Sequence, residues 1–204
     1  TLDKERGVLQ KTKDINLNEY KISDNLGDGY FKYFDMGNGI ELSFVNFNLK
    51  KDFAYEFKLM KRGLELFYCI EGNILCGDYK NNNSVEINPG EVHFWKSNSC
   101  SEGWMKYPEE NNIKMICIYF DDNFFDKLSC YGSQKIRKMI FNDELNDFTK
   151  KVNLPSLLVP FNQMARCEWG CDKISEILYL QSKAIEIISI FVNNEFFKEA
   201  SQNN

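Results

Sequence analysis

The chain has 204 residues, of which 43% are apolar and 15% aromatic, enough to bury the core of one large domain or of a medium domain with an appendage. Its net charge is −5 and only four of its 25 basic residues are arginines, so this stretch lacks the basic surface that binds nucleic acid. The sequence contains no run of about eighteen apolar residues and no secretory pattern at its amino terminus, which predicts a cytoplasmic protein without a membrane span.

The first third of the chain reads as an arm followed by short strands. Residues 1 to about 20 are polar with scattered apolar anchors, and they predict an irregular arm. Two apolar runs, 30–35 and 40–47, flank Met36-Gly37-Asn38-Gly39, whose Asn-Gly pair is a strong hairpin signal. Residues 53–58 alternate apolar and polar side chains at period two, which predicts a further strand.

The stretch from Gly63 to Ser101 contains two strand-turn-strand pieces. In residues 64–76 the turn is Glu71-Gly72-Asn73, and in residues 85–95 it is Asn88-Pro89-Gly90. Glycine and asparagine accept the positive backbone angles of tight turns, so both pieces are predicted to be hairpins. Together with an apolar run at 113–120, they predict an all-β unit, a small antiparallel barrel or sandwich, that ends near residue 120.

Helices are predicted after Phe120. Asp121-Asp122 suits a helix cap, Ser156 suits a second one, and the segment from Asp172 to about Lys198 has the strongest helical periodicity in the chain. This last helix carries two adjacent apolar stripes. The first comprises Ile174, Leu178, Ile185, Ile188 and Val192, and the second comprises Ile177, Leu180, Ala184, Ile187 and Phe191.

The second stripe predicts a dimer interface. Its residues lie three, four, three and four apart, the spacing of a helix that pairs with another helix, whereas the first stripe is suited to pack on the chain's own core. Any buried helix also produces a short run of this spacing, so burial of both stripes within one chain remains the alternative.

The strand order resembles the cupin fold, and two motif remnants carry the resemblance. Glu65 and Gly72 keep the glutamate-to-glycine spacing of the first cupin motif, but its two histidine positions fall within residues 58–61, which read Lys-Leu-Met-Lys. Pro89-Gly90-Glu91 keeps the start of the second motif, while Ser101 replaces its closing histidine. The chain has a single histidine and cannot build a multi-histidine centre, so no metal site, cofactor or catalytic residue is predicted.

Candidate ligand-binding residues come from the predicted strands. Glu65 points inward if it keeps the cupin register, where it would meet a cationic or hydroxyl-bearing ligand or pair with a neighbouring lysine. His93 would hydrogen-bond a bound molecule or serve as a satisfied core residue. The strand aromatics either line an apolar pocket or form ordinary core. The predicted pocket comprises Glu65, Phe67, Tyr30, Phe44, His93, Trp95 and Trp104.

A cupin without its metal ligands, followed by a long helix with two apolar stripes, resembles the amino-terminal sensing domain of AraC-family transcription regulators. The chain is similar to the PchR-like branch, where segments comparable to 64–73, 85–95, 154–158 and 179–186 recur in that order. The resemblance implies a mainly β chain with an α-helical tail. A cupin-like jelly-roll barrel would cover residues 1–121, and a helical region would cover residues 122–204, with a dimerisation helix at about 172–198.

The same resemblance implies partners. These are a small-molecule effector, such as a siderophore or another metabolite, a second copy of the chain bound through the last helix, and DNA bound only through a carboxy-terminal domain outside this sequence. The predicted function is a non-enzymatic ligand-sensing and dimerisation module, in which the effector changes how the tail helices present the DNA-binding domains.

Two other classes of function remain open at this point. A metal-independent cupin enzyme, such as a sugar isomerase, would use Glu65 and His93 as acid and base, which requires both side chains to reach one substrate atom. A storage or scaffold cupin would have neither a pocket nor an attached domain.

Overall fold

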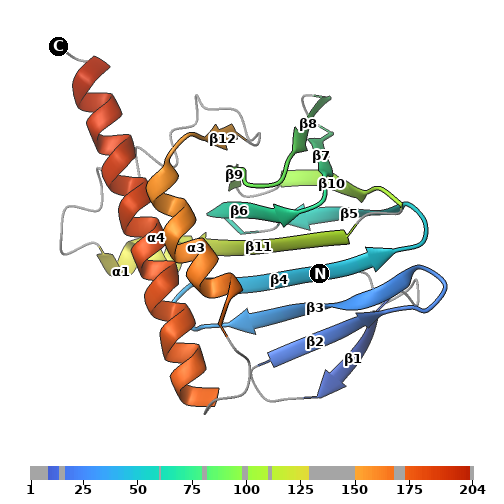
Figure 1. Ribbon diagram of the computed structural model, residues 1–204. Helices are drawn as coiled ribbons and strands as arrows, with labels where there is room; N and C mark the ends of the chain where they lie inside the picture. Colours follow the sequence, from blue (N-terminus) through green and yellow to red (C-terminus); the bar gives the residue numbers. More distant parts are fainter. Residues whose placement is uncertain are drawn as a thin grey trace.

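The computed structural model describes residues 9–13, 17–59, 61–79, 82–97, 101–109, 112–128, 150–167 and 173–202. Figure 1 shows two β-sheets, with helices α3 and α4 side by side next to the larger one. The strands are β1 (Leu9–Lys13), β2 (Leu17–Ile22), β3 (Gly27–Asp35), β4 (Ile40–Leu49), β5 (Phe53–Leu59), β6 (Gly63–Glu71), β7 (Ile74–Asp78), β8 (Asn83–Ile87), β9 (Val92–Ser97), β10 (Ser101–Tyr107), β11 (Asn112–Asp121) and β12 (Lys150–Val152). The helices are α1 (Asp122–Lys127), a 3-10 turn (Pro155–Leu157), α3 (Leu158–Ala165) and α4 (Lys173–Gln202).

The described strands form two antiparallel sheets. The larger has eight strands in the order β1-β2-β3-β4-β11-β6-β9-β12, and the smaller has four in the order β5-β10-β7-β8. The chain passes repeatedly from one sheet to the other, as in the double-stranded β-helix of cupins. The predicted fold class, a mainly β cupin-like jelly roll with a helical tail, is therefore confirmed.

The two strand-turn-strand pieces between Gly63 and Ser101 are not hairpins. β6 pairs with β9 and β11, whereas β7 pairs with β8 and β10, so the turns at Gly72 and Gly90 carry the chain between the sheets. Both glycines have positive φ angles, 81° and 83°. The hairpin prediction is wrong because a glycine turn reports a change of direction but not which strands pair. Instead, β6–β7 and β8–β9 are the two arms of one long bent hairpin.

The central strands of the larger sheet are buried on both faces. On β11, Ile116 and Ile118 lie in the core shared with the helices, while Met115 and Cys117 lie in the core between the two sheets. β6 divides in the same way, and its Leu66 and Phe67 belong to different cores. The period-two alternation of a strand therefore assigns successive residues to the helix side and to the barrel interior.

Helix α1 begins where the sequence predicts. Asp121 caps it, and the carboxylate accepts a hydrogen bond from the Phe124 N–H at 3.2 Å. The predicted Asn-Gly hairpin joins β3 to β4 beneath this cap, where a Cβ at Gly39 would collide with the Asp121 carboxylate. The second predicted cap is wrong, because Ser156 lies inside the 3-10 turn and α3 has no side-chain cap.

Helix α4 buries the stripe whose spacing predicts a dimer interface. Leu180, Ala184, Ile187 and Phe191 are at most 1% exposed, and they lie in the core that α3, α4 and the larger sheet share, with Ile177 packed against it. The Phe191 ring lies 5.3 Å from the ring of Phe94 on β9. The assignment of this stripe to a dimer interface is therefore wrong, since its side chains already have partners within the chain.

The first stripe of α4 faces outward over most of its length. Ile174, Leu178 and Ile185 are 68%, 59% and 48% exposed. Toward the end of the stripe Ile188 turns into the core, and Val192 is half-buried. The two stripes thus exchange the roles that the sequence assigns to them.

The ends of the predicted barrel differ in part from expectation. β2 pairs with β3 over residues 17–21, so the described part of the predicted arm is strand. β11 stops at Asp121 and α1 starts at the next residue, but β12 later returns to the sheet beside β9, and the helices share a core with the sheet. The division into two domains at residue 121 stays a prediction.

Candidate functional site

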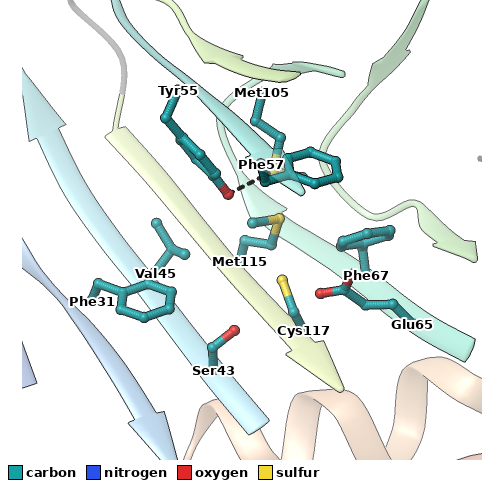
Figure 2. Close-up of a pocket in the computed structure, with 10 residues that line it drawn as sticks. All are labelled: Phe31, Ser43, Val45, Tyr55, Phe57, Glu65, Phe67, Met105, Met115 and Cys117. Carbon is teal, nitrogen blue, oxygen red and sulfur yellow. Dashed lines mark hydrogen bonds between the residues drawn. The ribbon is translucent and has the colours of Figure 1, made fainter. Parts of the chain in front are cut away.

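A cavity of about 130 Å³ lies between the two sheets. Strands β3, β4, β5, β6, β10 and β11 form its walls (Figure 2). Most of its side chains are aromatic or contain sulfur. The described lining residues are Phe31, Ser43, Val45, Tyr55, Phe57, Glu65, Phe67, Met105, Met115 and Cys117. A mostly apolar cavity with a few polar groups is the usual form of a small-molecule site.

The register of the larger sheet brings the polar lining residues together. Cys117 on β11 lies directly opposite Ser43 on β4 and Phe67 on β6. Residues directly opposite each other share a face, so these three side chains form one row of the cavity wall. In the neighbouring row, Glu65 on β6 lies opposite Tyr119 on β11. Strands that are far apart in sequence thereby supply one continuous surface.

Glu65 carries the one carboxyl group in the described lining. Figure 2 shows it beside Phe67, near the thiol of Cys117. No group in the described part of the chain hydrogen-bonds this carboxyl, and its removal from water raises its pKa to about 8, with a further contribution from the nearby Glu41 carboxylate. Glu65 is therefore mostly neutral at pH 7 when nothing pairs with it.

The other polar groups of the cavity are protonated and already engaged. The Tyr55 hydroxyl donates to the Met105 sulfur at 3.1 Å. Burial raises the pKa of Tyr55 and of the Cys117 thiol well above their ordinary values. A thiol that stays protonated is a poor nucleophile, so the cavity is not suited to covalent chemistry. It is suited to bind a molecule through apolar contacts and through a polar interaction with the Glu65 carboxyl.

The structure places two of the seven predicted pocket residues, Glu65 and Phe67, in the cavity lining. Phe44, also an aromatic residue of a predicted strand, lies on the opposite face of β4, in the helix-side core. The centre of its ring is 6.0 Å from that of Phe34. The prediction for Phe44 is wrong because a shift of one residue along a strand changes the face.

Tyr30 and Trp104 are displaced for the same reason. Each precedes a lining residue, Phe31 on β3 and Met105 on β10, so alternation turns both away from the cavity. Trp95 is 1% exposed and packs behind the lining, with its ring 5.1 Å from that of Phe57. These three residues are therefore corrected from pocket to surrounding structure.

Eight lining residues are absent from the prediction. On β5, the spacing of Tyr55 and Phe57 at period two is a signal that identifies both as inward-facing. On β4 and β11 both faces are apolar, so no pattern in the sequence separates the cavity side from the helix side. The missed residues are Phe31, Ser43, Val45, Tyr55, Phe57, Met105, Met115 and Cys117.

His93 lies outside the cavity lining, in a polar cluster at the edge of the larger sheet that also contains Glu91 and Lys151 and that we call the Glu91 cluster. The His93 Nε2 atom is 3.1 Å from one carboxylate oxygen of Glu91, and the Lys151 ammonium donates to the other oxygen at 2.5 Å. Lys151 belongs to β12 and lies opposite His93. The cluster therefore joins β12 to β9.

Two residues of the cluster, His93 and Glu91, have shifted pKa values. Burial lowers the pKa of His93, although Glu91 opposes this effect. Burial alone would raise the pKa of Glu91, but hydrogen bonds from the Asn88 N–H, Lys151 and His93 hold it at about 2. At pH 7 the cluster therefore consists of a neutral imidazole, a carboxylate and an ammonium group.

The residues at the cupin motif positions do not fit a metal ion. Lys58 is exposed and its ammonium pairs with Glu102, so this position offers a cation and no ligand. Glu65 is the one carboxyl group in the described lining, and the Cys117 thiol near it stays protonated. Within the described ranges, no group of three His, Cys, Asp or Glu side chains is placed to hold a metal.

The family model of the regulatory protein PchR N-terminal domain matches residues 27–203, which is nearly the whole chain. The chain belongs to this family. This confirms the resemblance to the cupin-like N-terminal domain of an AraC-type regulator.

Solved structures of similar fold include two larger proteins. The AraC-like transcriptional activator CuxR matches with a TM-score of 0.50 and 11% identity, over 91% of this chain and 59% of CuxR. Apo ToxT from Vibrio cholerae matches with a TM-score of 0.49 and 15% identity, over 81% of this chain and 56% of ToxT. At these identities the likeness concerns the fold alone, and this PchR N-terminal domain spans less than two thirds of either chain.

A cupin superfamily protein from Desulfitobacterium hafniense matches with a TM-score of 0.35 and 12% identity, over 45% of this chain and 76% of that protein. No curated protein matches the sequence. Among the described helices, none combines the length and the apolar character needed to cross a membrane.

Proposed function

We propose that this PchR N-terminal domain senses a small effector in the cavity between its sheets and dimerises through α4, as part of a cytoplasmic transcription regulator that binds DNA through a domain outside the chain. The observation that carries the proposal is a mostly apolar, partly open cavity between the two sheets in a member of a regulatory family. The fold shared with the transcriptional activator CuxR, which is larger than this chain, supports it.

The larger sheet offers a direct route from the cavity to α4. On β6 and β11, Phe67 and Cys117 line the cavity, while their neighbours Leu66, Ile116 and Ile118 lie in the core that holds α4. A ligand that moves the cavity face of these strands therefore also moves the surface on which α4 rests. An effector that binds one arrangement better than another then shifts the population of helix positions.

The effector that suits this cavity is small. Cavities of about 150 Å³ in other proteins hold a benzene-sized molecule, and this one has about 130 Å³. A siderophore with several chelating arms exceeds that volume, so the proposal favours a compact metabolite over a siderophore.

The dimer interface that we propose is the exposed stripe of α4. Four of the six exposed large hydrophobic side chains in the described part of the chain lie on this helix: Ile174, Leu178, Tyr179 and Ile185. Ile174, Leu178 and Ile185 follow one another at intervals of four and seven residues. This is the spacing of positions that face a partner helix in a coiled coil, so the proposed occupant is α4 of a second copy.

Sedimentation velocity tests the dimer. The double variant Leu178→Glu, Ile185→Glu is expected to sediment as a folded monomer, because it places two charges in the interface and leaves the buried stripe intact. The control Asn193→Glu adds a charge at an exposed position outside the stripe and is expected to stay dimeric. A wild-type monomer, or a double variant that stays dimeric, would contradict the proposed interface.

A thermal-shift screen of small metabolites tests sensing, because a ligand that binds only the folded state raises its melting temperature. Ser43→Leu, which places a larger side chain in the cavity wall, is expected to abolish the shift caused by any true effector. The matched control Ser84→Leu lies at an exposed position of β8 and is expected to keep the shift. If the screen finds ligands and each of them still raises the melting temperature of Ser43→Leu, the cavity is not the sensing site.

The enzyme alternative requires Glu65 and His93 to act on one substrate atom. Glu65 lines the cavity, whereas His93 lies outside the described lining and its Nε2 atom faces Glu91. This geometry favours the regulatory proposal over acid–base catalysis by this pair.

A further inference from the structure

We propose that the effector is a small organic cation, an ammonium group on a compact apolar or aromatic body, which the Glu65 carboxylate binds among the aromatic side chains of the cavity. This inference rests on the proposed function and specifies the chemical class of its ligand. It follows from the charge, the composition and the size of the cavity.

The charge of the cavity wall selects against anions. Glu65 is the one carboxyl in the described lining, and none of the ten described lining residues is a lysine, arginine or histidine. A carboxylate or phosphate ligand would lose its hydration and meet no opposite charge, which is a severe cost in an apolar cavity. A cation, by contrast, would meet a carboxyl that has no hydrogen-bond partner in the described part of the chain.

The aromatic rings of the wall favour the same class. Phe31, Tyr55, Phe57 and Phe67 come from three strands and surround the space beside Glu65 (Figure 2). Aromatic rings attract cations through their quadrupoles, and this attraction is strongest where water is excluded. A carboxylate combined with several rings is the composition that proteins use to hold organic ammonium groups.

The cavity also limits the size of the cation. Its volume of about 130 Å³ is close to that of cavities that accept a single aromatic ring. A ligand of one ring, or of a short alkyl chain, with one ammonium group fits this space. Long polyamines and peptides do not.

Binding of a cation is coupled to the titration of Glu65. Its carboxyl is mostly protonated at pH 7, with a pKa of about 8, so a cationic ligand must displace that proton. The other titratable groups near it are Glu41 on β4, Tyr119 and Cys117 on β11, and Tyr55 on β5. Burial keeps the three neutral acids protonated across this range, and Glu41 pairs with Lys61 at 3.3 Å. Glu65 is therefore the group whose charge changes on binding.

Three ring compounds that differ in charge test the class: benzylamine, benzyl alcohol and benzoate. Their affinities for the 204-residue chain are measured by calorimetry between pH 6 and pH 9. Benzylamine is expected to bind more tightly than the other two, with an affinity that rises about tenfold per pH unit below the pKa of Glu65. Glu65→Gln is expected to weaken benzylamine binding about 10- to 100-fold, while the exposed control Glu86→Gln keeps it.

The cavity variant separates failure of the class from failure of the proposed function. One contrary outcome is that benzyl alcohol or benzoate binds more tightly than benzylamine, in a way that Ser43→Leu abolishes. This result would contradict a cationic ligand but would still support the cavity as the sensing site. An affinity for benzylamine that is the same in Glu65→Gln as in the wild type, and the same at every pH, would also contradict the cationic class. If neither benzylamine nor any metabolite in the screen shows binding that depends on Ser43, both the class and the proposed function fail.

Discussion

A carboxyl group enclosed by aromatic and sulfur-containing side chains costs the folded state free energy whenever it ionises. The pKa of Glu65 is about 8 in the folded chain and about 4.5 when exposed. Below pH 4.5 the carboxyl is protonated in both the folded and the unfolded chain, so it does not change the free energy of unfolding. As pH rises from 4.5 to 8, only the unfolded state ionises freely, so the free energy of unfolding falls.

Glu65→Gln removes this pH dependence. The variant is expected to match the wild type near pH 4 and to exceed its free energy of unfolding by about 3 kcal/mol at pH 7, since each pKa unit corresponds to about 1.4 kcal/mol. Urea unfolding of both chains at a series of pH values measures the difference, with Glu86→Gln as the exposed control. A difference that stays constant from pH 4 to pH 8 would show that Glu65 does not carry the shift.

The same residue illustrates what the sequence predicts about the site. The glutamate-to-glycine spacing of the first cupin motif identifies Glu65 as inward-facing, and the structure places it in the cavity wall. The predictions for Phe44 and Tyr30 are wrong because their strands, β4 and β3, carry apolar side chains on both faces. Alternation of apolar and polar residues then does not show which face points into the cavity. The register of β4 with β11 supplies that information, and it depends on residues about 70 positions apart.

At the scale of elements, β12 is a three-residue strand held at the edge of the larger sheet by the Glu91 cluster. The folded pKa of Glu91 is about 2, below its ordinary value of 4.5, and that of His93 is also lowered. The Glu91 charge therefore stabilises the fold at neutral pH, whereas burial of His93 destabilises the fold only in acid, where the unfolded chain binds a proton that the buried imidazole resists. The free energy of unfolding falls as the pH drops below about 6.5, because His93 is protonated more readily in the unfolded chain. It falls again below 4.5, because the same holds for Glu91.

Glu91→Gln is expected to lower the free energy of unfolding at pH 7 by about 1–3 kcal/mol, because it removes the charge that Lys151 and the Asn88 N–H stabilise. The penalty is expected to shrink as pH falls from 4.5 toward 2. Glu102→Gln removes one partner of an exposed ion pair and serves as the control, with an effect below about 1 kcal/mol. Equal penalties at pH 7 and pH 3 would contradict a role for the Glu91 charge. Urea unfolding at several pH values measures both variants.

The elements themselves are well predicted and their partners are not. Turn residues such as Asn38 and Gly39 interrupt the apolar runs, and the strands β3 to β9 and β11 lie between such interruptions as expected, whereas β10 is not predicted. The turns at Gly72 and Gly90 look equally local, yet they connect different sheets. On α4, two apolar stripes offer two candidate core faces, and contacts such as Phe191 with Phe94 decide between them. Pairing and packing depend on distant residues, so local pattern leaves them open.

For the whole molecule, the two motif remnants predict the cupin-like fold, and the order of four segments between residues 64 and 186 predicts the family. The larger sheet is what integrates the molecule, because it has no solvated face over its central strands: the smaller sheet covers one side, and α3 and α4 cover the other. The cavity and the dimer interface that we propose are therefore separated by the thickness of one sheet and one helix.

This arrangement has a consequence for how such domains diverge. Along β6 and β11, every second residue faces the cavity and the residues between them face the helices. Substitutions at alternate positions, such as 65, 67, 115 and 117, alter the chemistry of the cavity without replacing any side chain of the core that holds α4. The residues that choose the ligand and the residues that hold α4 are thus different side chains of the same few strands, so ligand preference can diverge while the coupling through the backbone of these strands is kept.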